Sequence, residues 1–331
     1  MKQKSQYKQA NKIQKNKKKL KNKKSEKKME KIKIILLGTG GAVPTKERNM
    51  SAILMQYRGE NYLFDAGENA QQQIMKSGNS FMKINNIFLS HLHADHTLGI
   101  PGLVATMSLN ERTDELNIYG PKGTEKKIKQ LINYAMMGKK FKINITEIQT
   151  GKIWKNEELE ISAFKLKHEL ESYGYIIKQK DKEGIFQKEK AKKLGIPEGP
   201  LYAELQKGKK IKLNGKIIEP KQVMDYTKGE KGKKITIIAD TEYQKNNSEK
   251  AKESDLLIHE CSFKESEKEK AKETTHSTTK SVAKTANEAK VKKLLLYHYS
   301  ARYKNEKELE DEVRKEFKNV IAGKDLMEII I

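Results

Sequence analysis

The segment His91-Leu92-His93-Ala94-Asp95-His96 places four metal-binding side chains within six residues. In an extended chain, residues two apart project to the same side, so His91 and His93 can bind one metal ion. Asp95 and His96 can then turn towards a second ion beside it. The set combines imidazole and carboxylate without a thiolate, which suits zinc or another divalent first-row ion. The spacing therefore predicts a site that holds two metal ions, of the kind used in hydrolysis.

Further candidate ligands lie elsewhere in the chain, which has only seven histidines: His91, His93, His96, His168, His259, His276 and His298. His168 precedes the apolar segment 172–175, while Asp240 and His298 each follow a short apolar run. A single histidine beside an apolar strand is more often structural. With the cluster at 91–96 present, however, we expect His168, Asp240 and His298 to converge on the metal ions.

Short apolar runs, most of them ending on a polar residue, dominate both halves of the chain. They predict strands at 32–37, 52–57, 61–64, 87–90, 235–239, 256–258 and 294–297. Helices are expected at about 65–76, from residue 99 or 101 onwards, and at about 277–289. Strands that deliver polar residues at their carboxyl ends indicate two sheets meeting at one edge, with the site in the crevice there. The expected fold is an α/β sandwich.

Residues 178–233 interrupt this pattern and carry 16 Lys against 8 acidic residues. The segment contains the turn-rich sequence Gly195-Ile196-Pro197-Glu198-Gly199-Pro200-Leu201-Tyr202. We interpret it as an inserted arm that binds a partner, because loops of this length are uncommon in compact domains unless they are functional. The alternative is an ordinary surface excursion.

The net charge of +24 is unevenly distributed, because residues 1–31 hold 14 Lys and 2 Glu and so account for half of it. This tail lacks the apolar residues needed to fold and is expected to be disordered. It could bind a polyanion such as RNA, or reflect composition alone, with Met29 as the true start. The single cysteine, Cys261, fits a reducing compartment, no run of 18 apolar residues occurs, and no signal peptide is expected. We expect a cytoplasmic protein that does not span a membrane.

Motifs beside the histidine cluster carry a family resemblance. They are Gly38-Thr39-Gly40-Gly41-Ala42-Val43-Pro44-Thr45-Lys46-Glu47-Arg48-Asn49, His259-Glu260-Cys261-Ser262 and Tyr297-His298-Tyr299-Ser300-Ala301-Arg302-Tyr303. Together with 91–96 and 199–208, they resemble ribonuclease Z, the tRNA 3′-processing endonuclease family of the metallo-β-lactamase superfamily. The departures are Ala94 in place of Gly, Cys261-Ser262 in place of Ala-Thr, and Tyr297 in place of Thr.

The resemblance implies a metallo-β-lactamase αββα sandwich at 32–331, with a flexible tRNA-binding arm at 178–233 that includes Gly199 and Pro200. It also implies two Zn²⁺ ions per subunit, with Mn²⁺ as the alternative. One ion would be held by His91, His93, His168 and Asp240, and the other by Asp95, His96, Asp240 and His298.

The same resemblance implies an endoribonuclease that removes the 3′ trailer from precursor tRNA. A hydroxide shared by the two ions would attack phosphorus, leaving a 3′ hydroxyl on the tRNA and a 5′ phosphate on the trailer. Asp95 would be the acid/base residue, assisted by His276, which Glu260 would orient. For His276, a capping role at the next helix is the alternative. The resemblance further suggests a homodimer.

Three basic side chains are candidates for contacts to substrate phosphates: Lys46, Arg48 and Arg302. Solvated surface charges are the alternative. A dinucleotide-binding loop is excluded at Gly38-x-Gly40, because Val43 stands where the third glycine is needed.

Two other functions compete with this interpretation. The chain could be a small-substrate phosphodiesterase, or another hydrolase such as an arylsulfatase-like enzyme or a lactonase, because fold and metal ions do not fix the substrate. It could also be a non-catalytic RNA-binding protein. The arm and the basic loop favour RNA over a small ester, and the complete set of seven candidate ligands favours an enzyme.

Overall fold

The structure is a computed structural model that describes residues 29–135 and 141–331. Most of the basic tail expected at 1–31 therefore lies outside the described residues. Two compact units divide the chain. The larger comprises 31–180 and 233–331, and the described part of the smaller comprises 29–30 and 181–232.

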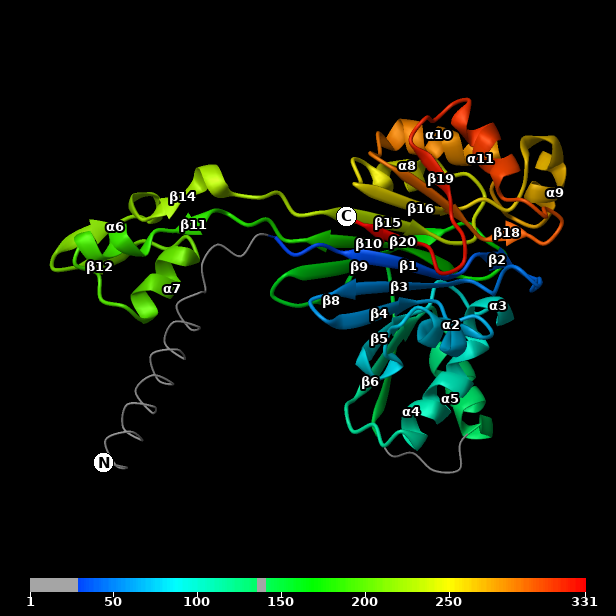
Figure 1. The fold of residues 1–331 in the computed structure, drawn as a ribbon, viewed down its shortest axis with the longest axis horizontal. Helices are drawn as coiled ribbons and strands as arrows, with labels where there is room; N and C mark the ends of the chain where they lie inside the picture. The colour runs from blue at the N-terminus through cyan, green and yellow to red at the C-terminus, as the bar shows by residue number, and fades with distance from the viewer. Residues whose placement is uncertain (1–28, 136–140) are drawn as a thin grey trace, which may run out of the picture. The chain divides into compact units, whose positions relative to one another are not determined.

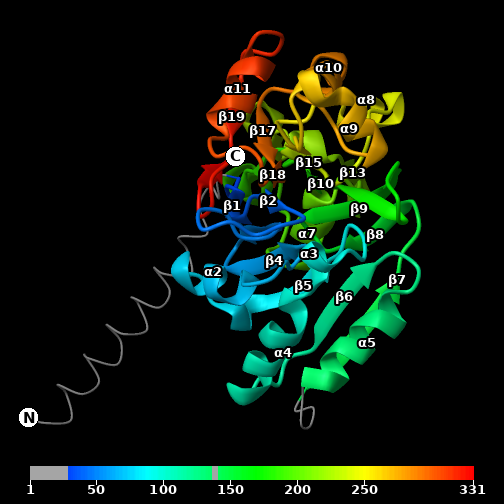
Figure 2. The same ribbon diagram turned by 90° about the vertical axis from the view of Figure 1, so that its right-hand side faces the viewer.

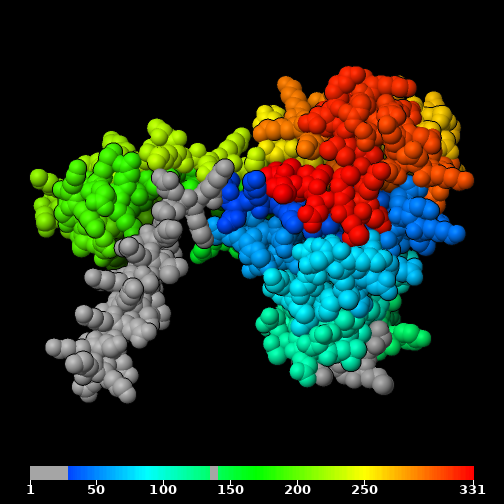
Figure 3. Space-filling view, viewed as in Figure 1, coloured from blue at the N-terminus to red at the C-terminus, as the bar shows by residue number. Residues whose placement is uncertain are grey.

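The first sheet of the larger unit has seven strands in the order β20-β1-β3-β4-β5-β6-β7. Their bounds are β20 Glu328–Ile330, β1 Lys33–Gly38, β3 Ala52–Tyr57, β4 Glu60–Phe64, β5 Ile84–Phe88, β6 Leu116–Gly120 and β7 Ile143–Glu147. The strands from β4 to β7 run parallel, whereas β20, β1, β3 and β4 pair antiparallel. In Figure 3 the C-terminal segment, drawn in red, lies against the blue first strand, in agreement with the pairing of Lys33 with Ile330.

The second sheet also has seven strands, in the order β19-β17-β16-β15-β10-β9-β8. Their bounds are β19 Val320–Ala322, β17 Leu294–Tyr297, β16 Leu256–Glu260, β15 Lys234–Ile238, β10 Ser172–Gln179, β9 Leu159–Leu166 and β8 Gly151–Lys155. The strands β15, β16, β17 and β19 run parallel. A short parallel pair, β2 (Gly40–Gly41) and β18 (Tyr299–Ser300), connects the loops at one end of the sandwich.

Helices cover the outer face of each sheet (Figure 1; Figure 2). The first sheet carries α2 Ala70–Lys76, α4 Gly99–Leu109 and α5 Thr124–Ala135, and the second carries α8 Lys245–Ala251, α10 Thr279–Ala289 and α11 Lys307–Arg314. Two short helices, α3 Ala94–Thr97 and α9 Lys268–Glu273, lie in the connecting segments. The unit is therefore a four-layer αββα sandwich, which confirms the expected fold.

Alternation along the strands explains why strands such as β1 and β17 are almost entirely apolar. In β1, Ile34 and Leu36 pack in the core between the sheets, while Ile35 and Leu37 pack beneath the helices. In β16, Ile258 faces the inner core and Leu257 faces α10 and its neighbours. Because successive side chains point to opposite faces, a strand buried on both faces needs apolar residues at every position.

The smaller unit has its own secondary structure and its own apolar core. Its elements are β11 Ile185–Phe186, α6 Lys188–Lys193, α7 Pro200–Gln206, β12 Ile211–Leu213, β13 Lys216–Ile218 and β14 Met224–Asp225. Buried residues from α6, α7, β12 and β13 form one cluster, in which Leu205 is fully buried. Residues 181–232, which lie within the insertion expected at 178–233, thus form a compact body of their own.

Among the helices that the structure describes, none combines the length and the apolarity needed to cross a bilayer.

A buried arginine in the larger unit provides a test of its packing. Arg112 is 2% exposed, and its guanidinium donates hydrogen bonds to three backbone carbonyls, of Met82, Asp114 and Glu115, at 2.8–2.9 Å, and to Asn85 Oδ1 at 2.7 Å. Replacing Arg112 by Met removes the donor that these four acceptors share. We predict that the free energy of unfolding falls by about 2–4 kcal/mol, measured by urea denaturation.

The matched control for this prediction is Lys126→Ala, at an exposed position of α5. It should change the free energy of unfolding by less than about 0.5 kcal/mol. An Arg112→Met protein as stable as the control would show that the guanidinium bonds contribute little.

Candidate metal centre

The histidine segment begins where β5 ends. The Leu89 N–H donates to Tyr119 O of β6 at 2.7 Å, which keeps the chain extended beyond the strand. The extended segment continues to His93, which is the N-cap of α3. His91 and His93 therefore come from extended chain, whereas Asp95 and His96 come from the first turn of a helix, as the spacing predicts.

One group of candidate ligands comprises His91, His93, His168 and Asp240, whose ligand atoms all lie within 4.8 Å of one another. His93 Nδ1 is 2.9 Å from His91 Nε2 and 3.3 Å from His168 Nε2. Asp240 Oδ2 is 3.7 Å from His91 Nε2 and 3.9 Å from His168 Nε2. Three segments distant in sequence thus direct nitrogen and oxygen atoms to one point.

A second group comprises Asp95, His96, Asp240 and His298, within the same 4.8 Å limit. Asp240 Oδ1 lies 3.4 Å from His96 Nε2 and 3.2 Å from His298 Nε2. Asp95 Oδ2 lies 3.6 Å and 3.5 Å from the same two nitrogens. Asp240 therefore belongs to both groups, with one carboxylate oxygen facing each. The structure brings together all seven side chains for which the resemblance implies metal binding.

The chemistry of these donors fits divalent metal ions. Asp240 is 2% exposed, and its Oδ1 has no hydrogen-bond donor among the described residues. Burial and the charge of His96 lower the pKa of His91 well below its usual value, which leaves the imidazole neutral. Burial would raise the pKa of Asp240, but the charges of His298 and His96 lower it well below its usual value, so the carboxylate is ionised. Burial lowers the pKa of His96, but the charges of Asp240, Asp95 and Asp65 raise it well above its usual value, so a metal ion would displace a proton there.

Residues behind the ligands set the orientation of the rings. Asp65 accepts hydrogen bonds from Ser90 N at 2.7 Å and Ser90 Oγ at 2.8 Å, and His96 Nδ1 donates to it at 2.8 Å. His168 Nδ1 lies 3.1 Å from the Thr275 carbonyl, which can only accept a hydrogen bond. Both rings are therefore protonated on Nδ1 and present Nε2 to the cluster. Asp65 thus fixes the loops by hydrogen bonding.

Several residues with left-handed backbone surround the cluster. Four of them are Ala42 (φ 61°), Asp65 (φ 55°), Thr275 (φ 52°) and His298 (φ 58°). Such conformations cost free energy in residues other than glycine and persist where surrounding contacts impose them. One such contact is the Ala42 N–H, which donates to Asp95 Oδ2 at 2.8 Å. Gly41 packs on the His298 ring so closely that an added Cβ would lie 2.4 Å from it. The loop of 38–49 is thus fitted against the ligands.

Glu260 and His276 form a pair beside the cluster. His276 Nδ1 is 3.1 Å from Glu260 Oε1, and its ring stacks on His298 with centroids 5.4 Å apart. Burial lowers the pKa of His276, but the charge and hydrogen bond of Glu260, with the charge of Asp240, raise it to about 9. The imidazole is therefore a cation at neutral pH. His276 lies between candidate ligands, with its ring also 5.1 Å from that of His168.

His259 is the one histidine that the structure keeps apart from the candidate ligands and from His276. It is buried within β16, and its Nδ1 lies 2.7 Å from the Glu260 carbonyl. That carbonyl can only accept, so the ring donates to its own backbone. His259 therefore has a structural role.

The candidate phosphate-binding residues have different surroundings. Lys46 is exposed on the loop of 38–49. The guanidinium of Arg302 is ion-paired with Glu267 and lies 4.9 Å from the centre of the Phe263 ring. Gly199 and Pro200 are exposed at the start of α7, in the smaller unit.

Arg48 departs from the expectation. Its side chain is buried, and the residue as a whole is 6% exposed. Its guanidinium donates to the Tyr303 carbonyl and lies 3.7 Å from Glu306. In this structure it is therefore not available to a phosphate group. The basic sequence of the loop gave no indication that one of its two cations connects the loop to the C-terminal segment.

Asp325 is a residue that sequence reasoning missed. Its carboxylate accepts hydrogen bonds from Thr39 N and Oγ1 at 2.9 and 2.8 Å, and from Asn49 N and Nδ2 at 2.8 Å each. It thereby closes both ends of the loop of 38–49. No motif surrounds Asp325 in the sequence, so only the structure could find it.

Two stacked sheets with outer helices and a histidine cluster at one edge define the metallo-β-lactamase fold. The crystal structure of the short form of human tRNase Z is similar with a TM-score of 0.65 and 26% identity, covering 90% of this chain and 98% of that chain. The Bacillus subtilis metallo-β-lactamase fold protein YhfI has a TM-score of 0.66, with 91% and 100% coverage, and its 19% identity supports a common fold alone.

Sequence comparison identifies the family. Ribonuclease Z of Nitrosopumilus maritimus is 45% identical over 302 residues, covering 91% of this chain and all of that protein, and ribonuclease Z of Archaeoglobus fulgidus is 42% identical, with 90% and 97% covered. The chain belongs to the ribonuclease Z family. A family model described as Anti-Pycsar protein Apyc1 also matches residues 32–188, a span that ends before Asp240 and His298.

The Glu260–His276 pair should make the stability of the metal-free protein depend on pH. Since the pKa of about 9 lies above the ordinary 6.5, the pair stabilises the fold fully below pH 6.5, and this contribution is lost as the pH rises through 9. The substitution Glu260→Gln removes the negative charge beside His276 but leaves the imidazole buried. We predict a His276 pKa below 6.5 in that variant, followed by NMR titration.

The control is Asp311→Asn, at an exposed position of α11. It should leave the pKa of His276 near 9. Circular dichroism would establish that both variants remain folded. A Glu260→Gln protein in which His276 still titrates near 9 would show that other charges raise the pKa.

Proposed function

We propose that this chain is a zinc-dependent endoribonuclease that removes the 3′ trailer from precursor tRNA. The observation that carries the proposal is the arrangement of seven ligand side chains in two groups that share Asp240. The family assignment supports RNA as the substrate, because the curated relatives are ribonucleases and a similar structure is a tRNase.

The metal ions would be held by the two groups described above, one ion in each. When bound, two divalent ions would lower the pKa of a water molecule and stabilise negative charge on the phosphate. Zn²⁺ fits the imidazole-rich donor set best, and Mn²⁺ is the alternative to test.

We assign the acid/base steps to Asp95, assisted by His276 and Glu260. Burial would raise the pKa of Asp95, but the charge of His96 and the hydrogen bond of His298 lower it well below its usual value. Asp95 is thus ionised and able to take the proton of the attacking water. As oxygen bonds to phosphorus, the bond to the ribose 3′ oxygen breaks. The protonated His276, oriented by Glu260, would supply a proton to that leaving oxygen, directly or through Asp95.

The products would be a tRNA with a 3′ hydroxyl and a trailer with a 5′ phosphate. We also propose, from the family resemblance, that the enzyme acts as a cytoplasmic homodimer. Sedimentation of the purified protein as a monomer would contradict the dimer.

A small-substrate phosphodiesterase of the same superfamily is the second candidate. The fold and the candidate metal ligands are equally compatible with it, because they do not fix the substrate. The smaller unit favours RNA, because residues 181–232 carry 13 Lys and 8 acidic residues on a compact body. A basic body of this size is useful for a polyanion and unnecessary for a small ester.

Cleavage of an end-labelled precursor tRNA by protein loaded with Zn²⁺ or Mn²⁺ tests the proposed function. We predict a single metal-dependent cut at the end of the mature tRNA that leaves a 3′ hydroxyl. Asp95→Ala should lower kcat by at least about 100-fold, because the acid/base residue is lost. The exposed variant Asp311→Asn should behave as wild type. Turnover of a small diester without cleavage of precursor tRNA would favour the second candidate.

The role proposed for the smaller unit can be tested by deletion. The antiparallel strands β10 and β15 are paired as far as Lys178 and Lys234, so a short turn can replace residues 181–232. We predict that the shortened protein still hydrolyses bis(p-nitrophenyl) phosphate, whereas its Kd for precursor tRNA rises by at least about tenfold, since many phosphate contacts are lost. An unchanged Kd would show that the larger unit binds tRNA alone.

A further inference from the structure

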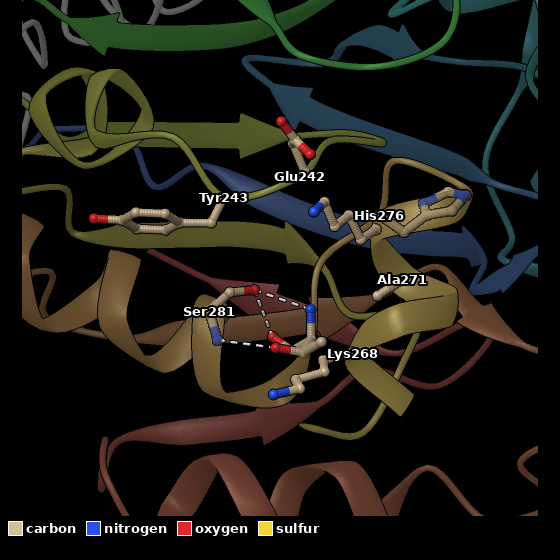
Figure 4. Close-up of a pocket in the computed structure, with 8 residues that line it drawn as sticks. Glu242, Tyr243, Lys268, Ala271, His276 and Ser281 are labelled. Carbon is tan, nitrogen blue, oxygen red and sulfur yellow. Dashed lines mark hydrogen bonds between the residues drawn. The ribbon is translucent and has the colours of Figure 1, made fainter. Parts of the chain in front are cut away.

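A pocket of about 260 Å³ lies beside His276, outside the two ligand groups (Figure 4). Three segments of the larger unit form it: residues 242–243, which follow Asp240, the helix α9, and residues 276–281, which lead into α10. Figure 4 shows Tyr243 and His276 at opposite sides of the pocket, with Lys268 and Ser281 below. The pocket is smaller than the about 300 Å³ at which typical ligand pockets begin. Its size suits one nucleotide or part of one.

The wall between this pocket and the metal centre is thin and well fixed. Thr275 Oγ1 bonds His168 Nδ1 at 2.8 Å, and the Ser277 N–H donates to Glu260 at 2.8 Å. Ser277 Oγ donates to the Thr241 carbonyl at 2.7 Å. The segment of 275–277 thus touches the metal centre and also joins two walls of the pocket. A strand of RNA with its scissile phosphate at the ligands would have its next nucleotide near this pocket.

Tyr243 provides the pocket with a rigid aromatic ring. Its hydroxyl lies 2.9 and 3.0 Å from the two carboxylate oxygens of Glu288, which also accepts from Ser248 Oγ at 2.7 Å. Lys284 Nζ lies 4.3 Å from the ring centroid. The ring is only partly buried and cannot turn without breaking these contacts. A fixed, partly exposed aromatic ring is the surface on which RNA-binding proteins stack a base.

The charge of the pocket favours an anion. Lys268 and Lys272 are exposed and lie one turn apart on α9. Among residues 29–135 and 141–331, no carboxylate lies within 4.0 Å of either ammonium group. The one acidic residue of the lining, Glu242, is ion-paired with Lys167. Two cations without carboxylate partners, beside an aromatic ring, match a phosphate and a base of one nucleotide.

We propose that this pocket is a subsite for one nucleotide of the RNA strand next to the scissile phosphate. Its base stacks on Tyr243, and its phosphate binds Lys268 and Lys272. The inference rests on the proposed function, since it assigns a part of the same substrate. It adds a recognition element in the larger unit, separate from the contacts proposed for the smaller unit.

The test compares kcat/KM for precursor tRNA with kcat/KM for bis(p-nitrophenyl) phosphate, which has no adjoining nucleotide. Two variants remove the subsite, Tyr243→Ala and the double variant Lys268→Ala/Lys272→Ala. In each, the ratio of the two kcat/KM values should fall about tenfold, chiefly through a higher KM for the RNA. Tyr243→Phe, which keeps the ring, should retain most of the ratio. The control Lys76→Ala/Lys126→Ala removes two exposed charges from α2 and α5 and should retain all of it.

Abasic substitutions in the precursor identify the nucleotide. One precursor would lack the base on the 5′ side of the cleaved bond, and a second would lack the base on the 3′ side. For one of them, kcat/KM of the wild-type protein should fall to the value of Tyr243→Ala. That result supports the subsite and shows which side of the bond occupies it, whereas no effect of either change overturns the proposal. Subsite variants that match the control overturn the proposal, as do variants that lose activity on both substrates equally. Wild-type protein that hydrolyses only the small diester would instead overturn the proposed function, and the subsite with it.

Discussion

The buried carboxylate of Asp240 is the constraint on which the rest of the site depends. An ionised carboxylate with 2% exposure is costly unless opposite charges or metal ions offset it. Asp240 has histidine nitrogens on both sides, with Oδ2 towards His91 and His168 and Oδ1 towards His96 and His298. These side chains come from both sheets. The two halves of the sandwich must therefore meet at this edge for the charge to be compensated.

The loops around Asp240 contain strained backbone conformations, which contacts within the site stabilise. His298 and Asp65 adopt left-handed backbone, and each is fixed by several hydrogen bonds or by close packing against Gly41. Glu260 accepts from the backbone N–H groups of Thr241, Ser262 and Ser277. Two carboxylates, Asp65 and Glu260, thus organise the two sides of the site by hydrogen bonding. Such fixed surroundings give ligand positions that need little rearrangement.

The sequence predicted structural features correctly where a single strand determines them. Runs of apolar residues predicted the strands at 52–57 and 294–297 with the bounds that the structure has, because strands buried on both faces have few polar positions. The sequence did not predict features that depend on contacts between segments far apart in the chain. The burial of Arg48 depends on Tyr303 and Glu306, and the role of Asp325 depends on Thr39 and Asn49. Neither relation leaves a local pattern, and the apolar core of the smaller unit was likewise not apparent from its turn-rich sequence.

The division into two units places all the candidate ligands in one of them. The larger unit alone supplies all the candidate metal ligands and catalytic residues, and the smaller unit is inserted between two antiparallel neighbours, β10 and β15. An insertion at that connection leaves the pairing of Lys178 with Lys234 intact, so its length and charge can vary without shifting Asp240 at the other end of β15. Phosphodiester chemistry requires only the cluster. The choice of a long RNA over a small ester must therefore come from basic and aromatic side chains outside it.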